Sequence, residues 1–262
     1  MRRSSLVLLL FTISLFSFCQ ETVYDWDWKK EKYVIGTSML LVGGTSYIKY
    51  KTPLLTAAQL ASADVNSINA LDRTAVDNEN FKSQLVSDIL GTGSLVMPLV
   101  FYFSDVGKKE IFTIGGMAFE TMLLTVFVVD GMKVAFRRSR PYTYNENLSQ
   151  EDRLKSSARF SYPSGHTGSS AALSFFTAKV FSDLHPESRW KPAVWTAAIT
   201  IPAVTGFLRY HSGNHFPTDI ITGYALGAGI GYLVPLLHNK EHKDLGFSIY
   251  PIGNGLAINY QF

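Results

Sequence analysis

Two histidines and one aspartate stand at spacings that suit nucleophilic and acid–base chemistry. His215 precedes Asp219 by four residues, where an apolar stretch is about to begin. A carboxylate at that spacing can hold an imidazole in one tautomer and leave the other ring nitrogen free to attack. His166 follows Pro163-Ser164-Gly165 and could donate a proton to a leaving group. A histidine on its own is more often structural than catalytic, so the surrounding residues decide the interpretation.

Three long cationic side chains accompany the histidines, namely Lys133, Arg140 and Arg209. Together they could surround a phosphate and the charge on its oxygens in the transition state. The first two alone would equally suit the positive flank of a membrane helix. Ser164 and Gly165 open an apolar segment, and free amides at a helix N-terminus bind anions. No acidic cluster is spaced to hold Mg²⁺, so these cations would have to replace a metal.

Taken in order, the clusters resemble the type 2 phosphatidic acid phosphatase superfamily, which also contains vanadium haloperoxidases and bacterial acid phosphatases. The family pattern K-x6-R-P matches residues 133–141, P-S-G-H matches 163–166, and R-x5-H-x3-D matches 209–219. The resemblance covers about residues 111–237. Leu208 stands where the family usually has serine, which puts one supporting hydrogen bond in doubt.

The resemblance implies a metal-independent phosphatase that acts on a lipid-type phosphomonoester or diphosphate. His215 would attack phosphorus and form a phosphohistidine, Asp219 would orient it, and His166 would protonate the leaving oxygen. No cofactor is expected; vanadate would inhibit, or would be the cofactor of a haloperoxidase. A soluble periplasmic acid phosphatase of broad specificity is the other alternative. The residues that would hold the phosphoryl oxygens are Lys133, Arg140, Ser164, Gly165 and Arg209.

The composition favours a lipid environment or a large buried core. Hydrophobic residues make up 47% of the 262 residues and charged residues only 17%, whereas soluble domains average about 25% charged. The mean hydropathy of +0.10 argues against deep embedding along the whole chain. The net charge of +3 is too small to indicate nucleic acid, and no nucleic-acid motif is present. The expected partners are therefore a membrane and a phosphorylated lipid or polyprenyl substrate.

Six apolar stretches predict an all-α bundle of about six core helices, because they are longer than typical strands and rich in Ala, Leu and Gly. A membrane-embedded bundle is favoured over a soluble one with apolar core helices. Residues 52–88 have apolar positions at helical spacing and are interpreted as amphipathic helices. The apolar stretches are residues 34–48, 89–104, 111–132, 168–178, 193–208 and 220–237.

The two ends of the chain differ from this core. Arg2 and Arg3 precede an apolar run over 6–18, which is typical of a signal peptide spanning residues 1–19; an uncleaved anchor is the alternative. The sole cysteine, Cys19, lies there, so disulfides and cysteine metal sites are excluded. At the other end, Gly253-Asn254-Gly255 between two β-like runs predicts a short C-terminal β-hairpin.

These features predict four segments in a cell-envelope protein. They are a signal peptide (1–19), an N-terminal helical extension (20–88), a phosphatase helical core (89–240) and a β-like tail (241–262). The site would face the periplasm from a membrane-embedded core, because the loops on the opposite side are basic. Peripheral attachment on the periplasmic side is the alternative.

Overall fold

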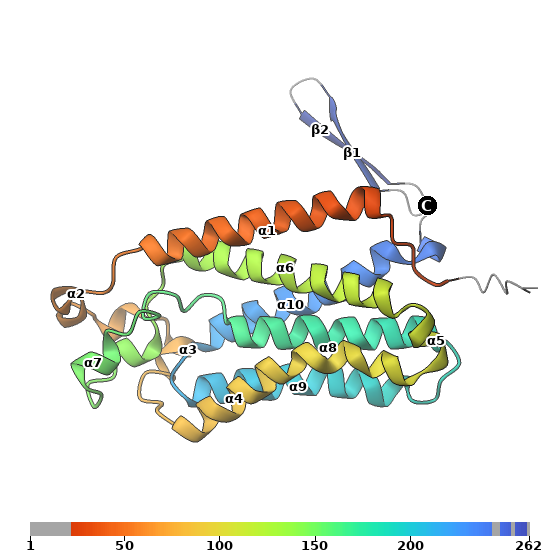
Figure 1. The fold of residues 1–262 in the computed structure, drawn as a ribbon. Helices are drawn as coiled ribbons and strands as arrows, with labels where there is room; N and C mark the ends of the chain where they lie inside the picture. Colours follow the sequence, from red (N-terminus) through yellow and green to blue (C-terminus); the bar gives the residue numbers. More distant parts are fainter. Residues whose placement is uncertain (1–21, 243–246, 253–254, 261–262) are drawn as a thin grey trace, which may run out of the picture.

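Helices make up most of the chain, as Figure 1 shows. The computed structural model describes residues 22–242, 247–252 and 255–260, so the predicted signal segment lies outside it. The expectation of a mostly helical protein is confirmed. The long elements are α1 (Trp28–Lys51), α4 (Phe81–Gly93) with its 3₁₀ continuation η2 (Ser94–Phe103), α6 (Ile111–Phe136), α8 (Gly165–Leu184), α9 (Lys191–His211) and α10 (Pro217–His238).

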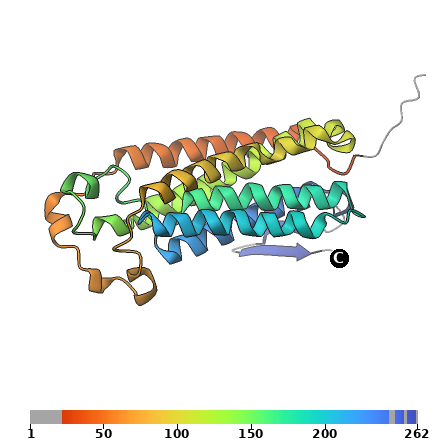
Figure 2. The same cartoon turned by 90° about the horizontal axis from the view of Figure 1, so that it is seen from below.

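Short helical turns connect these elements. Several of them gather at one end of the bundle in both views (Figures 1 and 2), and we call this the loop end. There the C-termini of α1, α6 and α9 meet the N-termini of α4, α8 and α10. The predicted boundary at residue 88 lies inside α4. The short elements are α2 (Ala57–Ala61), η1 (Val65–Ser67), α3 (Ala70–Arg73), α5 (Asp105–Lys109), η3 (Pro141–Thr143), α7 (Gln150–Arg153) and η4 (Lys240–His242).

Helices α8 and α10 pack with their backbones in close approach. A Cβ atom built on Gly227 would lie 2.0 Å from the carbonyl oxygen of Gly168, and one on Gly231 would lie 2.0 Å from that of Ala172. No side chain fits at such distances, so glycine is required at both positions. Small residues that let two helix backbones touch are typical of membrane-helix packing. This close contact between the two helices holds the start of α8 beside the start of α10.

The outer surface of the bundle is apolar and parts of its interior are polar. Phe103 and Phe112 are 82% and 93% exposed, whereas Thr121, Thr125 and Ser170 are fully buried. Among the residues that the structure describes, three helices are long and apolar enough to cross a membrane, by length and composition. The expectation of a membrane protein with transmembrane helices is confirmed at this level. The candidate spans are Phe81–Phe103, Ile111–Thr143 and Pro217–His238.

The C-terminal residues contain two strands, β1 (Phe247–Ile252) and β2 (Gly255–Tyr260). They pair antiparallel, with Phe247 opposite Tyr260. The turn proposed to join them falls at residues 253–254, which lie outside the described residues. The C-terminal hairpin as a whole therefore stays a prediction.

Candidate active site

His215 lies in the short loop between α9 and α10, with 1% of its surface exposed. Its Nδ1 is 3.6 Å from Asp219 Oδ2, and its Nε2 is 3.4 Å from Arg140 Nη1. The longer distance exceeds that of an ordinary hydrogen bond. The four-residue spacing works because Asp219 sits in the first turn of α10. The imidazole is thus held between a carboxylate on one side and a guanidinium on the other.

Asp219 is fixed by hydrogen bonds from three directions. Its Oδ2 accepts from Ser161 Oγ at 2.5 Å and from the amide of Phe216 at 2.9 Å. Its Oδ1 accepts from Arg138 Nη1 at 2.7 Å. A carboxylate with these donors cannot rotate freely, so it presents a fixed edge to His215.

Arg138 extends this network to the N-terminal part of the chain. Its Nη2 donates to Asp72 Oδ2 at 2.7 Å, and Asp72 in α3 also accepts from the amide and hydroxyl of Thr218 at 2.9 and 2.6 Å. Burial alone would raise the pKa of Asp72, but the hydrogen bonds from Arg138 and Thr218 outweigh it and lower the pKa. Asp72 therefore braces the start of α10, where Asp219 lies.

Two of the predicted phosphate ligands approach His215 from α6 and the loop that follows it. The helix ends where Arg137 adopts a left-handed conformation with φ 46°. Beyond this turn, the Arg140 guanidinium donates to Asn214 O at 3.1 Å and Ser157 O at 3.0 Å. Lys133 Nζ lies 3.0 Å from where a Cβ on Gly165 would stand. Glycine at that position therefore leaves room for the ammonium group at the start of α8.

The N-terminus of α8 is open to an anion. Ser164 is its N-cap residue but makes no capping hydrogen bond with its side chain. Its hydroxyl pairs instead with Thr167 Oγ1 at 2.9 Å. The first amides of a helix have no partner within the helix, and together with Lys133 they form a site that suits phosphate oxygens.

His166 and Arg209 meet at a carboxylate that the sequence analysis did not single out. Asp88 Oδ1 is 3.2 Å from His166 Nε2 and 2.6 Å from Arg209 Nη1. Asp88 belongs to α4, and 43% of its side chain is exposed. It lies in the segment interpreted only as amphipathic helix, and no motif marks it. Asp88 balances part of the positive charge at this side of the site.

Positive charge and burial act together on the two histidines. Burial, followed by the charges of Arg140 and Arg209, holds the pKa of His215 well below its ordinary value of 6.5. Burial and then Arg209 lower the pKa of His166 to about 4, although Asp88 opposes the shift. Both rings are therefore neutral at pH 7 in this structure, and a bound anion would favour their protonated forms.

Two hollows meet at Lys133. The larger, of about 810 Å³, is lined by Lys133 and Arg140 together with Lys49, Tyr50 and Lys51 from the end of α1. The smaller, of about 280 Å³, is lined by Lys133, Gly165 and His166 and by the apolar side chains of Leu95 and Met122. The site thus has a cationic side beyond Arg140 and a partly apolar side beyond His166.

All eight residues predicted for the site lie together at the loop end of the bundle. Sequence reasoning missed Asp72, Asp88, Arg138 and Ser161. Arg138 stands inside the first motif and Ser161 just before the second, but the family pattern leaves both positions free. In the described part of the chain, no trio of histidine and acidic side chains converges here as a metal site would require.

Comparison with known proteins identifies the family. Residues 115–243 match the model of the PAP2 superfamily. This part of the chain belongs to the PAP2 superfamily. All eight predicted site residues lie within the PAP2 region, whereas Asp72, Asp88, Lys49 and Lys51 lie before it.

Several known phosphatases are similar over a part of their length. A lipid A 4'-phosphatase of Porphyromonas gingivalis is 25% identical over 54% of this chain and 57% of its own length. A lipid A 1-phosphatase of Rhizobium johnstonii is 32% identical over 55% of each chain. The matches span little more than half the length of these curated relatives. A crystal structure of a transmembrane PAP2-type phosphatidylglycerolphosphate phosphatase from Bacillus subtilis aligns with a TM-score of 0.47 and 20% identity, covering 78% of this chain and 94% of that one.

Proposed function

We propose that this protein is a phosphatase that hydrolyses a lipid-type phosphomonoester or diphosphate through a phosphohistidine intermediate, without a metal in the reaction. One observation carries the proposal: a buried imidazole whose Nδ1 faces Asp219 has its Nε2 3.4 Å from Arg140 Nη1. With one nitrogen facing the carboxylate, Nε2 is the nucleophile. A phosphate held by Arg140 would present its phosphorus to that nitrogen.

The reaction would proceed in two balanced steps. His215 Nε2 attacks phosphorus, the bond from phosphorus to the leaving oxygen breaks, and His166 gives its proton to that oxygen. Water then attacks the phosphohistidine, His166 takes the water proton, and the bond between phosphorus and nitrogen breaks. The low pKa of His166 fits this role only when phosphate is bound, because the dianion offsets the cations that lower the pKa. The cationic residues stabilise the charge that grows on the phosphoryl oxygens.

The two hollows suggest how a lipid substrate would lie. The proposed acid, His166, lines the smaller hollow with Leu95 and Met122, so an apolar leaving group would be placed on this side. Lys49 and Lys51 line the larger hollow and would attract an anionic head group. Relatives named as lipid A phosphatases support a substrate of this class. We further propose a cell-envelope location with the site facing the periplasm.

Phosphate release from a panel of lipids tests the proposal. Purified protein in detergent should hydrolyse at least one of lipid A, phosphatidic acid, phosphatidylglycerol phosphate and undecaprenyl diphosphate. His215→Ala should lose about 10³-fold or more in kcat. His211→Ala is the matched control, since it removes a nearby histidine that has no proposed role in the reaction and pairs with Ser83 Oγ at 2.9 Å, and it should keep most activity.

Three further results define the mechanism. A rapid quench into alkaline detergent should trap a base-stable, acid-labile phosphoenzyme in the unmodified protein and none in His215→Ala. Vanadate should inhibit, and EDTA at 25 °C should not stop turnover. Bromide oxidation that requires vanadate would overturn the phosphatase assignment, and full activity in His215→Ala would overturn the nucleophile.

A further inference from the structure

A second group of titratable side chains converges at the end of the bundle opposite the loop end. Glu31 lies in the first turn of α1, Glu120 lies within α6, and His238 is the last residue of α10. One nitrogen or oxygen from each lies within 4.8 Å of the others. Between 8% and 11% of each side chain is exposed. At 1.5 Å per residue along α10, His238 is about 28 Å from Asp219, so this cluster is separate from the phosphatase site.

The hydrogen bonds of His238 direct its free nitrogen into the cluster. Its Nδ1 is 2.8 Å from the carbonyl oxygen of Val234, which can only accept, so Nδ1 carries a proton. Its Nε2 lies 3.5 Å from Glu31 Oε1 and 3.5 Å from Glu120 Oε2. A carbonyl that fixes the tautomer in this way is the usual outer partner of a metal-binding histidine.

Glu120 supplies an independent indication of a missing ligand. Its Oε2 is buried and has no hydrogen-bond donor in the described part of the chain. A buried carboxylate oxygen without a donor is costly, and an ionisable residue within a candidate membrane span usually has a functional partner. This oxygen is directed at the space between the three side chains. A cation bound in this space would satisfy it.

We propose that Glu31, Glu120 and His238 bind a divalent transition-metal ion, with Zn²⁺ as the best match. One imidazole nitrogen and two carboxylate oxygens are ligands that Zn²⁺ accepts at about 2.0–2.2 Å. In a tetrahedral site such ligands lie about 3.3 Å apart, close to the 3.5 Å from His238 Nε2 to each carboxylate, and the two carboxylate oxygens lie within 4.8 Å of each other. An imidazolium would offset one of the two negative charges, whereas a dication beside a neutral imidazole offsets both.

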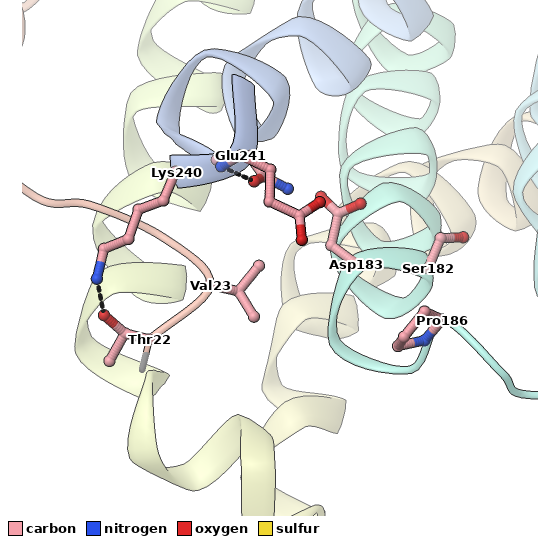
Figure 3. A pocket seen from close by; sticks show the side chains of 8 residues that line it. Thr22, Val23, Ser182, Asp183, Pro186, Lys240 and Glu241 are labelled. Carbon is pink, nitrogen blue, oxygen red and sulfur yellow. Dashed lines mark hydrogen bonds between the residues drawn. The ribbon is translucent and has the colours of Figure 1, made fainter. Parts of the chain in front are cut away.

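The surrounding residues give this ion a structural role. Trp26 stacks on His238 with ring centroids 5.7 Å apart and fits against Gly116, where a Cβ would come within 2.6 Å of the indole. The adjacent segment is held by Lys240, whose Nζ donates to Thr22 Oγ1 at 2.5 Å beside a cavity of about 350 Å³ (Figure 3). The ion would tie α1 to α6 and α10.

Metal content and thermal unfolding of untagged protein test the proposal. The purified protein should retain close to one zinc per chain by elemental analysis. After EDTA treatment the Tm should fall by about 5 °C or more, and micromolar ZnCl₂ should restore it. Glu120→Gln and Glu31→Gln should lose both the zinc and the response. Asp105→Asn should keep both, because this side chain is 99% exposed near the same end of the bundle.

Two ligand variants are used so that the proposal can still be tested if one of them misfolds. Glu31 lies near the start of α1, so Glu31→Gln tests the site even if Glu120→Gln fails to fold. Absence of bound metal together with no zinc-dependent Tm shift would overturn the proposal. An equal shift in Glu31→Gln would overturn it too, since zinc would then bind elsewhere. Phosphate release measured at 25 °C separates the two sites, because loss of this ion should leave the reaction at His215 intact.

Discussion

The two ends of the helical bundle bury charge of opposite sign. At the loop end, Lys133, Arg140 and Arg209 surround His215, and the carboxylates beside them include Asp88, Asp219 and Asp130, which lies 3.8 Å from Lys133 Nζ. At the opposite end, two carboxylates face a single imidazole. An excess of positive charge around an open helix N-terminus suits an anion, whereas an excess of negative charge suits a cation. The same physical cost of buried charge thus indicates a different ligand at each end.

Three helices contribute to both ends. Helix α1 carries Glu31 near its start and Lys49 near its end, α6 carries Glu120 and Lys133, and α10 carries Asp219 and His238. Because the helices are rigid over this length, each fixes a residue of one site relative to the other. The two sites are still chemically independent if changes at one leave the ligand of the other in place. The predictions below test this separation, beginning with the largest effect.

Replacement of Arg140 should reduce phosphatase activity at the loop end and leave the opposite end of the bundle unchanged. Its guanidinium lies 3.4 Å from His215 Nε2 and lines the larger hollow. Arg140→Ala should lower kcat/KM by about 10²–10³-fold, because charge on the phosphoryl oxygens in the transition state loses its nearest donor. Arg140→Lys should recover only part of this, since an ammonium cannot donate in the same forked geometry. Phosphate release with the best lipid of the panel is the measurement.

The zinc content of Arg140→Ala tests whether this change also affects the opposite end of the bundle. Arg140→Ala should retain the same metal as the unmodified protein and the same Tm response to EDTA. Loss of zinc in Arg140→Ala would show that the two ends are not separate. A kcat/KM within threefold of the unmodified protein would mean that Arg140 does not touch the phosphate.

The sequence predicts the loop end far better than the opposite end, for a physical reason. The residues proposed to bind phosphate occur in motifs because they lie at or beside helix termini, where a few consecutive residues can form a binding surface. Glu31, Glu120 and His238 meet only after α1, α6 and α10 pack, and their spacing along the chain follows no pattern. Asp88 is similarly hidden, because its role depends on α4 lying beside α8 and α9. Long apolar stretches predicted the helices, since burial and membrane contact act on whole helices.

Replacement of Asp72 should have a smaller effect than replacement of Arg140, and the effect should be on stability. Asp72→Asn should lower Tm by about 5 °C at pH 7, corresponding to about 2 kcal/mol, because Arg138 loses a buried charged partner. The pKa of Asp72 is below its ordinary value of 3.8, so its contribution is present above that value and is lost as pH falls through the folded pKa. The difference in Tm between the two proteins should therefore shrink below about pH 4.

The control for this prediction is Asp77→Asn, which changes the same charge at an exposed position between α3 and α4. It should leave Tm within about 1 °C of the unmodified protein. An equal loss in both variants would show that net charge, and not the contact with Arg138, determines the effect. Zinc binding should be unchanged in both.

Asp88→Asn should produce the smallest change, because it removes one negative charge from the mainly cationic loop end. Asp88 contacts Arg209 at 2.6 Å and would compete with a bound phosphate for it. Two charges about 4 Å apart interact by about 4 kcal/mol at an effective dielectric of 20, but Asp88 is 43% exposed. Solvent screening reduces the gain to about 1 kcal/mol, so vanadate should inhibit about fivefold more tightly.

The pH profile of Asp88→Asn distinguishes competition from a loss of structure. Asp88 opposes the fall in the pKa of His166, so its removal should lower that pKa further. Because the proposed acid must be protonated, the alkaline limb of kcat/KM should move to lower pH. A variant that is merely misfolded would lose activity at every pH and bind vanadate more weakly. Tighter vanadate binding together with a shifted alkaline limb would therefore show that Asp88 lowers the positive charge of the loop end. Neither result would depend on the proposed zinc site.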